Sequence, residues 1–136
     1  MPGRLGADDR VTIVAGLALA GVREVRGDRA AAAPLYRAAL ESTRRNPSDR
    51  ETLATALMES GRSRLAAGDW TTAEALLREA LAIREAEIPQ HWRTAEVRSL
   101  LGGALLGQKK AAEAAPLLRS GYEAMASHPA AIPRGD

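Results

Sequence analysis

The sequence predicts an all-α fold of three helix pairs, and three observations support this prediction. The hydrophobic residues, 46% of the chain, are mainly Ala and Leu, which have the highest helix propensity, and Phe is absent. Similar stretches recur at a spacing of 41 residues along the 136-residue chain. Each stretch follows a second apolar pattern of helical period, so every repeat consists of a helix, a short turn and another helix.

The repeat is clearest in the second helix of each pair. The three stretches are GDRAAAAPLYRAALE from Gly27, GDWTTAEALLREALA from Gly68 and KKAAEAAPLLRSGYE from Lys109. Identical residues recur without a gap at three positions: Ala32, Ala73 and Ala114; Leu35, Leu76 and Leu117; Arg37, Arg78 and Arg119. Gly27 and Gly68 predict turns, and Lys109 takes the same position in the third pair.

The first helix of each pair keeps the same register. Ala20, Gly61 and Gly102 each stand seven residues before the turn. Capping residues predict three helix starts: Asp8 or Asp9 for the first helix, Ser48 or Asp49 for the third, and Asp69 for the fourth. The links are marked by Pro47, Pro89 and Pro129. We therefore expect repeats over residues 9–47, 48–89 and 90–126, with tails at 1–8 and 127–136.

Small residues at matched positions predict that the two helices of each pair pack closely. Ala20, Gly61 and Gly102 are expected to face the second helix, where a large side chain would push the helices apart. Neither helix can bury its apolar stripe alone, so neighbouring pairs must stack. The expected architecture is an α-solenoid of about six helices.

The middle repeat resembles the tetratricopeptide repeat. That family's pattern of small residues, a turn glycine, an aromatic residue and Leu is matched by Gly61, Gly68, Trp70, Ala73, Leu77 and Ala80. The resemblance covers about residues 10–126, although Arg29 and Ala111 replace the aromatic residue in the outer repeats. It implies a right-handed solenoid that acts as a non-catalytic scaffold for protein–protein interaction.

Two finer resemblances accompany this one. The spacing exceeds the ordinary length of about 34 residues, and phrases such as EALLREALAIRE are similar to the long repeats of kinesin light chains and many bacterial proteins. The third repeat, AEVRSLLGGALLGQKKAAEAAPLLRSGYEAM, is similar to repeats in the C-terminal regions of bacterial serine/threonine protein kinases. The latter resemblance implies an alternative function, as an accessory sensor or scaffold segment of such a kinase.

In the tetratricopeptide repeat family, the first helix of each pair lines a concave groove. The matching positions in this chain are Val14, Leu17 and Gly21; Thr55, Met58 and Arg62; and Glu96, Ser99 and Gly103. The Lys and Asn residues with which some members clamp a C-terminal carboxylate are absent from these positions. The resemblance therefore implies a mixed, partly apolar groove for a helix or an extended segment of a partner protein.

After Met125 the sequence reads SHPAAIPRGD, without a polar helix to cover the last pair. An uncovered final pair exposes apolar surface to water. We therefore expect either that the sequence is a piece of a longer protein, or that a partner or a second copy covers this face. The candidate residues for self-association into a homo-oligomer are Leu117, Leu118 and Tyr122.

Catalytic, cofactor and metal sites are not expected. Gly102 and Gly107 have the spacing of a phosphate-binding loop, but Gln108 follows instead of Lys-Ser or Lys-Thr, and a helix precedes them. We interpret these glycines as the close-contact face of the fifth helix. His91 and His128 lie in linkers without the further ligands that a zinc site needs. Cys is absent, and no Ser stands in a G-x-S-x-G pattern.

The tryptophans and the acidic residues have structural interpretations. Trp70 occupies the family's aromatic core position, whereas Trp92, at the start of the fifth helix, suits either a core residue or a binding residue. Several acidic residues stand at helical spacing with arginines between them, which favours a solvated, ion-paired surface: Glu74, Glu79, Glu85 and Glu87, with Arg78 and Arg84. Lys109 and Lys110 form a small basic tip without an assigned role.

Charge and hydropathy narrow the classes of partner and compartment. The chain carries 19 basic and 17 acidic residues without a basic cluster, a balance that gives little attraction to nucleic acid. No segment reaches the ~18 apolar residues that a membrane span requires, so no membrane partner is expected. VTIVAGLALA, after Arg4 and Arg10, has a signal-peptide-like form, but Asp8 and Asp9 oppose it. We expect a cytoplasmic protein, with a signal peptide as the alternative.

Overall fold

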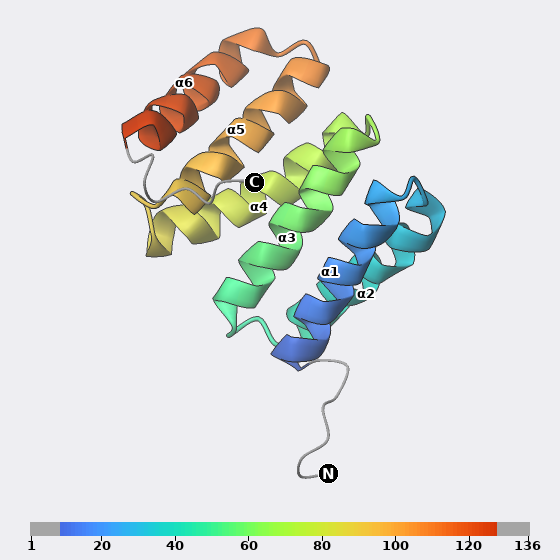
Figure 1. Cartoon of the computed structure of the whole chain (residues 1–136). Helices are drawn as coiled ribbons and strands as arrows, with labels where there is room; N and C mark the ends of the chain where they lie inside the picture. The colour runs from blue at the N-terminus through green and yellow to red at the C-terminus, as the bar shows by residue number, and fades with distance from the viewer. Residues whose placement is uncertain (1–8, 128–136) are drawn as a thin grey trace. The chain divides into compact units, whose positions relative to one another are not determined.

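The computed structural model describes residues 9–127, which form six α-helices and no strand (Figure 1). The helices are α1 (Arg10–Val25), α2 (Arg29–Arg45), α3 (Arg50–Ala66), α4 (Trp70–Glu87), α5 (Trp92–Gly107) and α6 (Ala111–Ser127). Over these residues the predicted all-α fold of three helix pairs is confirmed. The expected tail at 1–8 lies outside the described residues, as do His128 and Pro129 in the expected C-terminal tail.

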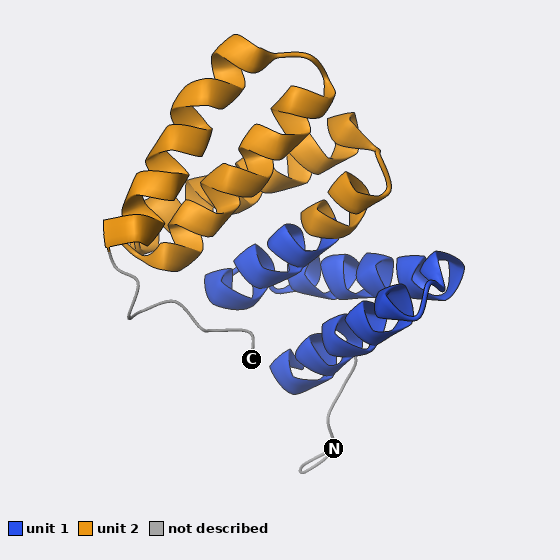
Figure 2. Cartoon of the chain, turned by 45° about the horizontal axis from the view of Figure 1, so that its top comes forward, with its two compact units in different colours: residues 1–60 blue, residues 61–136 orange. Residues whose placement is uncertain are grey.

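The chain divides into two compact units, coloured blue and orange in Figure 2. Unit 1 comprises residues 1–60 and unit 2 comprises residues 61–136, so the boundary falls inside α3. Within unit 1, α1 packs against α2. Within unit 2, α5 packs against both α4 and α6, and it therefore forms the centre of that unit.

One hydrogen-bonding pattern closes the turn inside each pair. The first residue after the turn donates its backbone N–H to the carbonyl five residues earlier: Asp28 to Arg23 at 2.8 Å, Asp69 to Arg64 at 2.9 Å, and Lys110 to Leu105 at 2.9 Å. The preceding residue is left-handed, with φ of 83° at Gly27, 79° at Gly68 and 63° at Lys109. These bonds satisfy carbonyl groups at the helix C-terminus. The three predicted turns are confirmed, and Lys109 adopts a conformation that normally favours glycine.

Aspartate side chains cap the helices at the predicted starts. Asp9, Asp49 and Asp69 each accept a hydrogen bond from a backbone N–H of the following turn, at 2.8, 3.2 and 3.4 Å. Asp28, which was not among the expected caps, does the same for α2 at 3.1 Å. Lys110 stands in the equivalent position before α6, and its ammonium group can only donate. The third turn therefore differs from the others at two successive residues.

In unit 1 the core between the helices is built from small and apolar side chains. Its members are Ile13, Leu17 and Ala20 of α1, Ala32, Tyr36 and Ala39 of α2, and Ala56 of α3. The Tyr36 hydroxyl donates to Glu24 Oε1 at 2.6 Å. This bond gives the buried phenol a partner, so the tyrosine fills the position that the later repeats give to leucine.

In unit 2 glycines set the distance between paired helices. A Cβ on Gly61 would stand 2.7 Å from Leu77 Cγ, and a Cβ on Gly102 would stand 2.6 Å from Leu118 Cγ. Such distances are too short for real carbon atoms, so a side chain at either position would require the facing leucine to shift. The two contacts are 41 residues apart, as the repeat requires, and the predicted close-contact face of α5 is confirmed.

Candidate functional site

Leu17, Met58 and Ser99 occupy one register position of the first helices, 41 residues apart. Leu17 belongs to the core of unit 1, and Met58 is buried. The Ser99 hydroxyl lies against Gly121 of α6, where a Cβ would overlap it. The side chains of Leu17 and Met58 are therefore buried, and the assignment of this position to a groove stays a prediction.

Val14, Thr55 and Glu96 occupy the position almost one helical turn earlier, and this position is accessible. Val14 is exposed, and Thr55 and Glu96 are half-buried. The Thr55 hydroxyl donates to the carbonyl oxygen of Glu51 at 3.0 Å, which holds the side chain against its own helix. Successive repeats thus present an apolar, a polar and an acidic side chain at this point.

Arg62 of α3 and Glu96 of α5 form an ion pair within unit 2. Arg62 Nη2 donates to Glu96 Oε2 at 2.8 Å, and both side chains remain partly exposed. Both residues were expected in a groove, but their contact was not, because 34 residues separate them in the sequence. An exposed pair of this kind contributes at most about 1 kcal/mol to stability. It can therefore exchange partners with a ligand at little cost to the fold.

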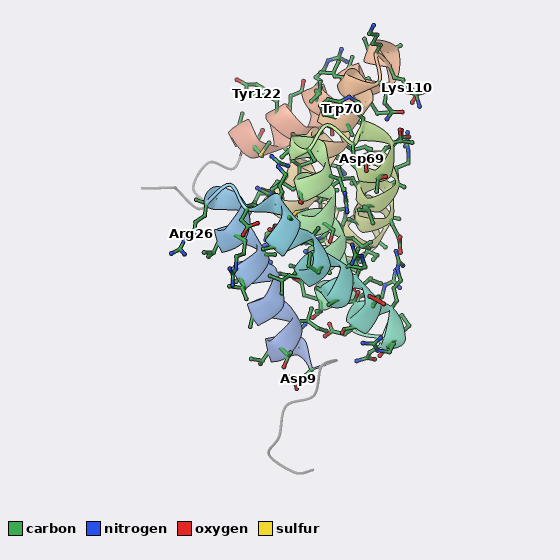
Figure 3. The ribbon with its side chains drawn as sticks, turned by 90° about the vertical axis from the view of Figure 1, so that its right-hand side faces the viewer. Asp9, Arg26, Asp69, Trp70, Lys110 and Tyr122 are labelled. Carbon is green, nitrogen blue, oxygen red and sulfur yellow. The ribbon has the colours of Figure 1, made fainter. Side chains whose placement is uncertain are left out.

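Among the three candidates for self-association, Tyr122 is the exposed one. Leu117 and Leu118 are half-buried, and the Leu118 side chain packs on Gly102 of α5 within the same unit. Tyr122 is 72% exposed and points outward from α6 (Figure 3). The accessible apolar surface of α6 is therefore centred on Tyr122 rather than on the leucines.

Glu74 of α4 is the centre of a polar cluster that joins three segments of unit 2. Gln108 Nε2 and Arg78 Nε each donate to its carboxylate at 2.7 Å, and Lys110 Nζ lies 3.5 Å from it. The hydrogen bond from Gln108, followed by that from Arg78, holds the pKa of Glu74 below its usual value. Lys110 thus ties the turn between α5 and α6 to α4. Only the spacing of Glu74 and Arg78 was visible in the sequence.

Asp49 has a similar role in unit 1, at the start of α3. Its carboxylate accepts from the Thr52 hydroxyl at 2.7 Å and from Arg10 Nη2 at 3.0 Å. The Thr52 bond is the main cause that lowers the pKa of Asp49, and Arg10 adds to it. Because Arg10 belongs to α1, the ion pair joins the first helix of one repeat to the first helix of the next.

The two tryptophans have different surroundings. The Trp70 ring lies on Gly107 of α5, where a Cβ would overlap it, so its predicted packing position is confirmed. Trp92 is half-buried, and the Arg93 guanidinium lies 5.4 Å from the centre of its ring. Beside it, His91 Nδ1 accepts from the Arg93 N–H at 3.1 Å and caps α5. Sequence reasoning missed this cap, because histidine is not among the usual capping residues.

An open groove of about 600 Å³ lies in unit 2 along α6. Its lining includes Arg98 of α5 and Arg119, Ser120 and Glu123 of α6. Arg98 also pairs with a carboxylate, Glu85 of α4, at 3.2 Å. The groove is mostly polar and was not predicted from the sequence, since its lining comes from three separate segments: the link before α5, α5 itself and α6. It is a second surface to which a polar segment of a partner can bind.

Residues 9–127 contain no group of three His, Asp or Glu side chains placed to hold a metal ion. None of the helices described is long and apolar enough to cross a bilayer. Gly102 and Gly107 both lie inside α5, so the stretch that resembled a phosphate-binding loop is helical.

Comparison with known proteins agrees with the repeated geometry. A family model described as tetratricopeptide repeat matches residues 11–86 and again residues 52–127. No curated protein matches the chain significantly. Tetratricopeptide repeats are non-catalytic helical scaffolds that generally mediate protein–protein interaction. Since the two matches together span all but the first residue of the six helices, the chain belongs to the tetratricopeptide repeat family.

Proposed function

We propose that this chain binds a segment of a partner protein on the exposed surface of its first helices, without a catalytic step. The residues of this first-helix surface are Arg62 and Glu96, both of which belong to unit 2. The observation that supports it most strongly is the Arg62–Glu96 ion pair, which holds two opposite charges at the surface of α3 and α5. A partner that carries charges of its own can be selected by these two groups.

The surface suits binding because helix packing has already ordered it. A preformed surface loses less conformational entropy on binding than a flexible one, so more of the contact energy appears as affinity. Within unit 2, Arg62 and Glu96 offer charged contacts that remain partly exposed. We therefore expect the ligand to be a helix or an extended segment that carries charged side chains.

Affinity capture followed by peptide mapping and calorimetric titration tests the proposal. The double variant Arg62→Glu with Glu96→Arg reverses both charges but keeps an ion pair between the same positions. Helicity by circular dichroism should stay unchanged. The affinity for the mapped peptide should fall by at least about ten-fold, because each charged contact of the ligand then meets the wrong sign.

The matched control is the double variant Glu85→Arg with Arg98→Glu. This pair also joins two helices of unit 2, at 3.2 Å, but it lies beside the groove along α6. It should leave the affinity for the peptide unchanged. Loss of binding in this control, with full binding in the Arg62 and Glu96 variant, would move the ligand to the groove along α6 and contradict the first-helix surface.

A further inference from the structure

The helices α1 and α6 expose apolar faces that correspond to the two halves of a contact made inside unit 2, between α5 and α4. We propose that α6 of one copy packs on α1 of a second copy, head to tail, in the way that α4 packs on α5. The occupant is a second copy of this chain, so the proposal goes beyond the binding of a partner segment. It does not use the residues of the first-helix surface.

Two contacts define the arrangement of α4 on α5. At one end the Trp70 ring lies on Gly107, so a large side chain of α4 fills the space left by a glycine of α5. Toward the other end Glu85 pairs with Arg98 at 3.2 Å. By the 41-residue repeat, α6 is the equivalent of α4, and α1 is the equivalent of α5 two repeats earlier.

Tyr122 and Leu19 are exposed, whereas the equivalent residues of α4 and α5 are buried. Tyr122 follows Leu81 by 41 residues and is 72% exposed, whereas Leu81 is 8% exposed. Leu19 precedes Leu101 by 82 residues and is 42% exposed, whereas Leu101 is 1% exposed. Each helix therefore exposes a large apolar side chain at a point where the repeat otherwise buries one. Burial of both would remove apolar area from water, which favours association.

At the positions equivalent to Trp70 and Gly107, the larger and the smaller side chain have changed sides. The equivalents of Trp70 and Gly107 are Ala111 in α6 and Val25 in α1, and both are exposed. The small residue is now on the α6 side and the larger one on the α1 side. The space that alanine opens can thus be filled by valine, which keeps the two surfaces complementary.

The ion pair of the α4–α5 contact has no counterpart in α6 or in α1, because both of its charged residues are replaced. The equivalents of Glu85 and Arg98 are Ala126 in α6 and Gly16 in α1. The side chains of Arg98 and Glu85 are 18% and 47% exposed, so loss of only one member would leave a partly covered charge without its partner. Loss of both leaves a small, uncharged contact. Because both members of the pair are replaced, the α6 face and the α1 face still fit each other. This match favours a second copy of the chain over an unrelated partner.

The two faces differ, so the contact is heterologous. A copy that uses its α6 still has a free α1, and another copy can add there. Contacts of this kind produce open chains or rings rather than only dimers. The average mass should therefore rise continuously with protein concentration.

Two single variants test the proposal in a way that separates it from symmetrical pairing. Leu19→Glu disables the α1 face and Tyr122→Glu disables the α6 face. Each variant alone should be monomeric by analytical ultracentrifugation between about 1 µM and about 1 mM, whereas the wild type associates. An equimolar mixture should form a heterodimer and nothing larger, because each variant keeps the one face that the other lacks.

Val14→Glu is the matched control, because Val14 is also an exposed apolar residue of α1 but lies on a different side of the helix from Leu19. It should associate like the wild type. Leu19→Ser and Tyr122→Ser are made in parallel, so that a charged variant that loses helicity does not end the test. A monomeric wild type at every concentration, self-association of either single variant, or a monomeric mixture of folded variants would overturn the proposal.

Discussion

Gly102 of α5 and Leu118 of α6 are in contact at the point where the two helices approach each other. A Cβ on Gly102 would lie 2.6 Å from Leu118 Cγ, and Gly61 and Leu77 have the same relationship at 2.7 Å. The same close approach of a glycine to a leucine therefore recurs in two repeats. Stability should depend on whether a glycine faces a neighbouring helix or open space.

Gly61→Ala should lower the free energy of unfolding by about 2 kcal/mol, because the new methyl group overlaps the fully buried Leu77. Gly102→Ala should have a smaller effect, since Leu118 is half-buried and can move. The control is Gly16→Ala in α1, where a Cβ meets nothing within 4 Å. It should raise stability by about 1 kcal/mol through helix propensity. Equal stability of the Gly61 and Gly16 variants in urea unfolding would contradict this interpretation.

Lys109→Gly should raise the free energy of unfolding by about 1 kcal/mol. Lys109 has φ of 63°, in the left-handed region that costs a residue with a Cβ about that much. Gly68 has the same place in the second turn, with φ of 79°, so Gly68→Lys should have an effect of opposite sign and similar size. Chemical denaturation of both variants checks this. No change in either would mean that the turns do not limit stability.

Tyr36→Phe should lower stability by about 1–2 kcal/mol, because it removes the hydrogen bond from a buried phenol to the Glu24 carboxylate at 2.6 Å. Tyr122→Phe is the control, since Tyr122 is exposed on α6. Its stability should stay within about 0.5 kcal/mol of the wild type. The two midpoints in urea make the comparison, and equal losses in the two variants would argue against a role for the bond.

Stability should decrease on acidification, and Glu74 should account for part of this decrease. The pKa of Glu74 is lower in the folded chain than its ordinary 4.5, so its charge stabilises the fold above that value. The contribution is lost as the pH falls through the folded pKa. Glu74→Gln should therefore be less stable at pH 7 and should lose less stability on acidification. Asp49, whose pKa is also lowered, should retain part of the acid sensitivity.

Glu41→Gln is the control for the acid measurement, because Glu41 is exposed on α2. Its stability should follow the wild-type curve as the pH falls. Thermal unfolding at a series of pH values compares the three proteins. A Glu74→Gln curve parallel to the wild-type curve would show that the cluster with Gln108 and Arg78 does not contribute to the pH dependence.

The sequence predicted the helices, the turns and the close contacts well, because each depends on residues that recur at one spacing. Gly102 is an example: its equivalence to Gly61 identified a helix face. The burial of Leu17 was not predicted, because the carried-over pattern distinguishes neighbouring sides of a helix poorly. Burial depends on the helix packed opposite, and the sequence alone does not reveal it.

The polar clusters were beyond sequence reasoning for a different reason. Glu74 lies in α4, whereas Gln108 and Lys110 lie in the turn between α5 and α6. Neither partner stands at a helical spacing from Glu74. The Arg62–Glu96 pair likewise depends on the way in which α3 and α5 lie beside each other within unit 2. Such contacts depend on side-chain reach and helix placement, which repeat periodicity does not contain.

The most direct test of the first-helix surface is to map a bound peptide by NMR. Amide resonances of the isotope-labelled chain are followed while the captured peptide is added. The largest shifts should occur around Arg62 and Glu96, with Arg119 and Glu123 nearly unmoved. Shifts concentrated on Arg119 and Glu123, with the first-helix residues unmoved, would contradict the proposed function.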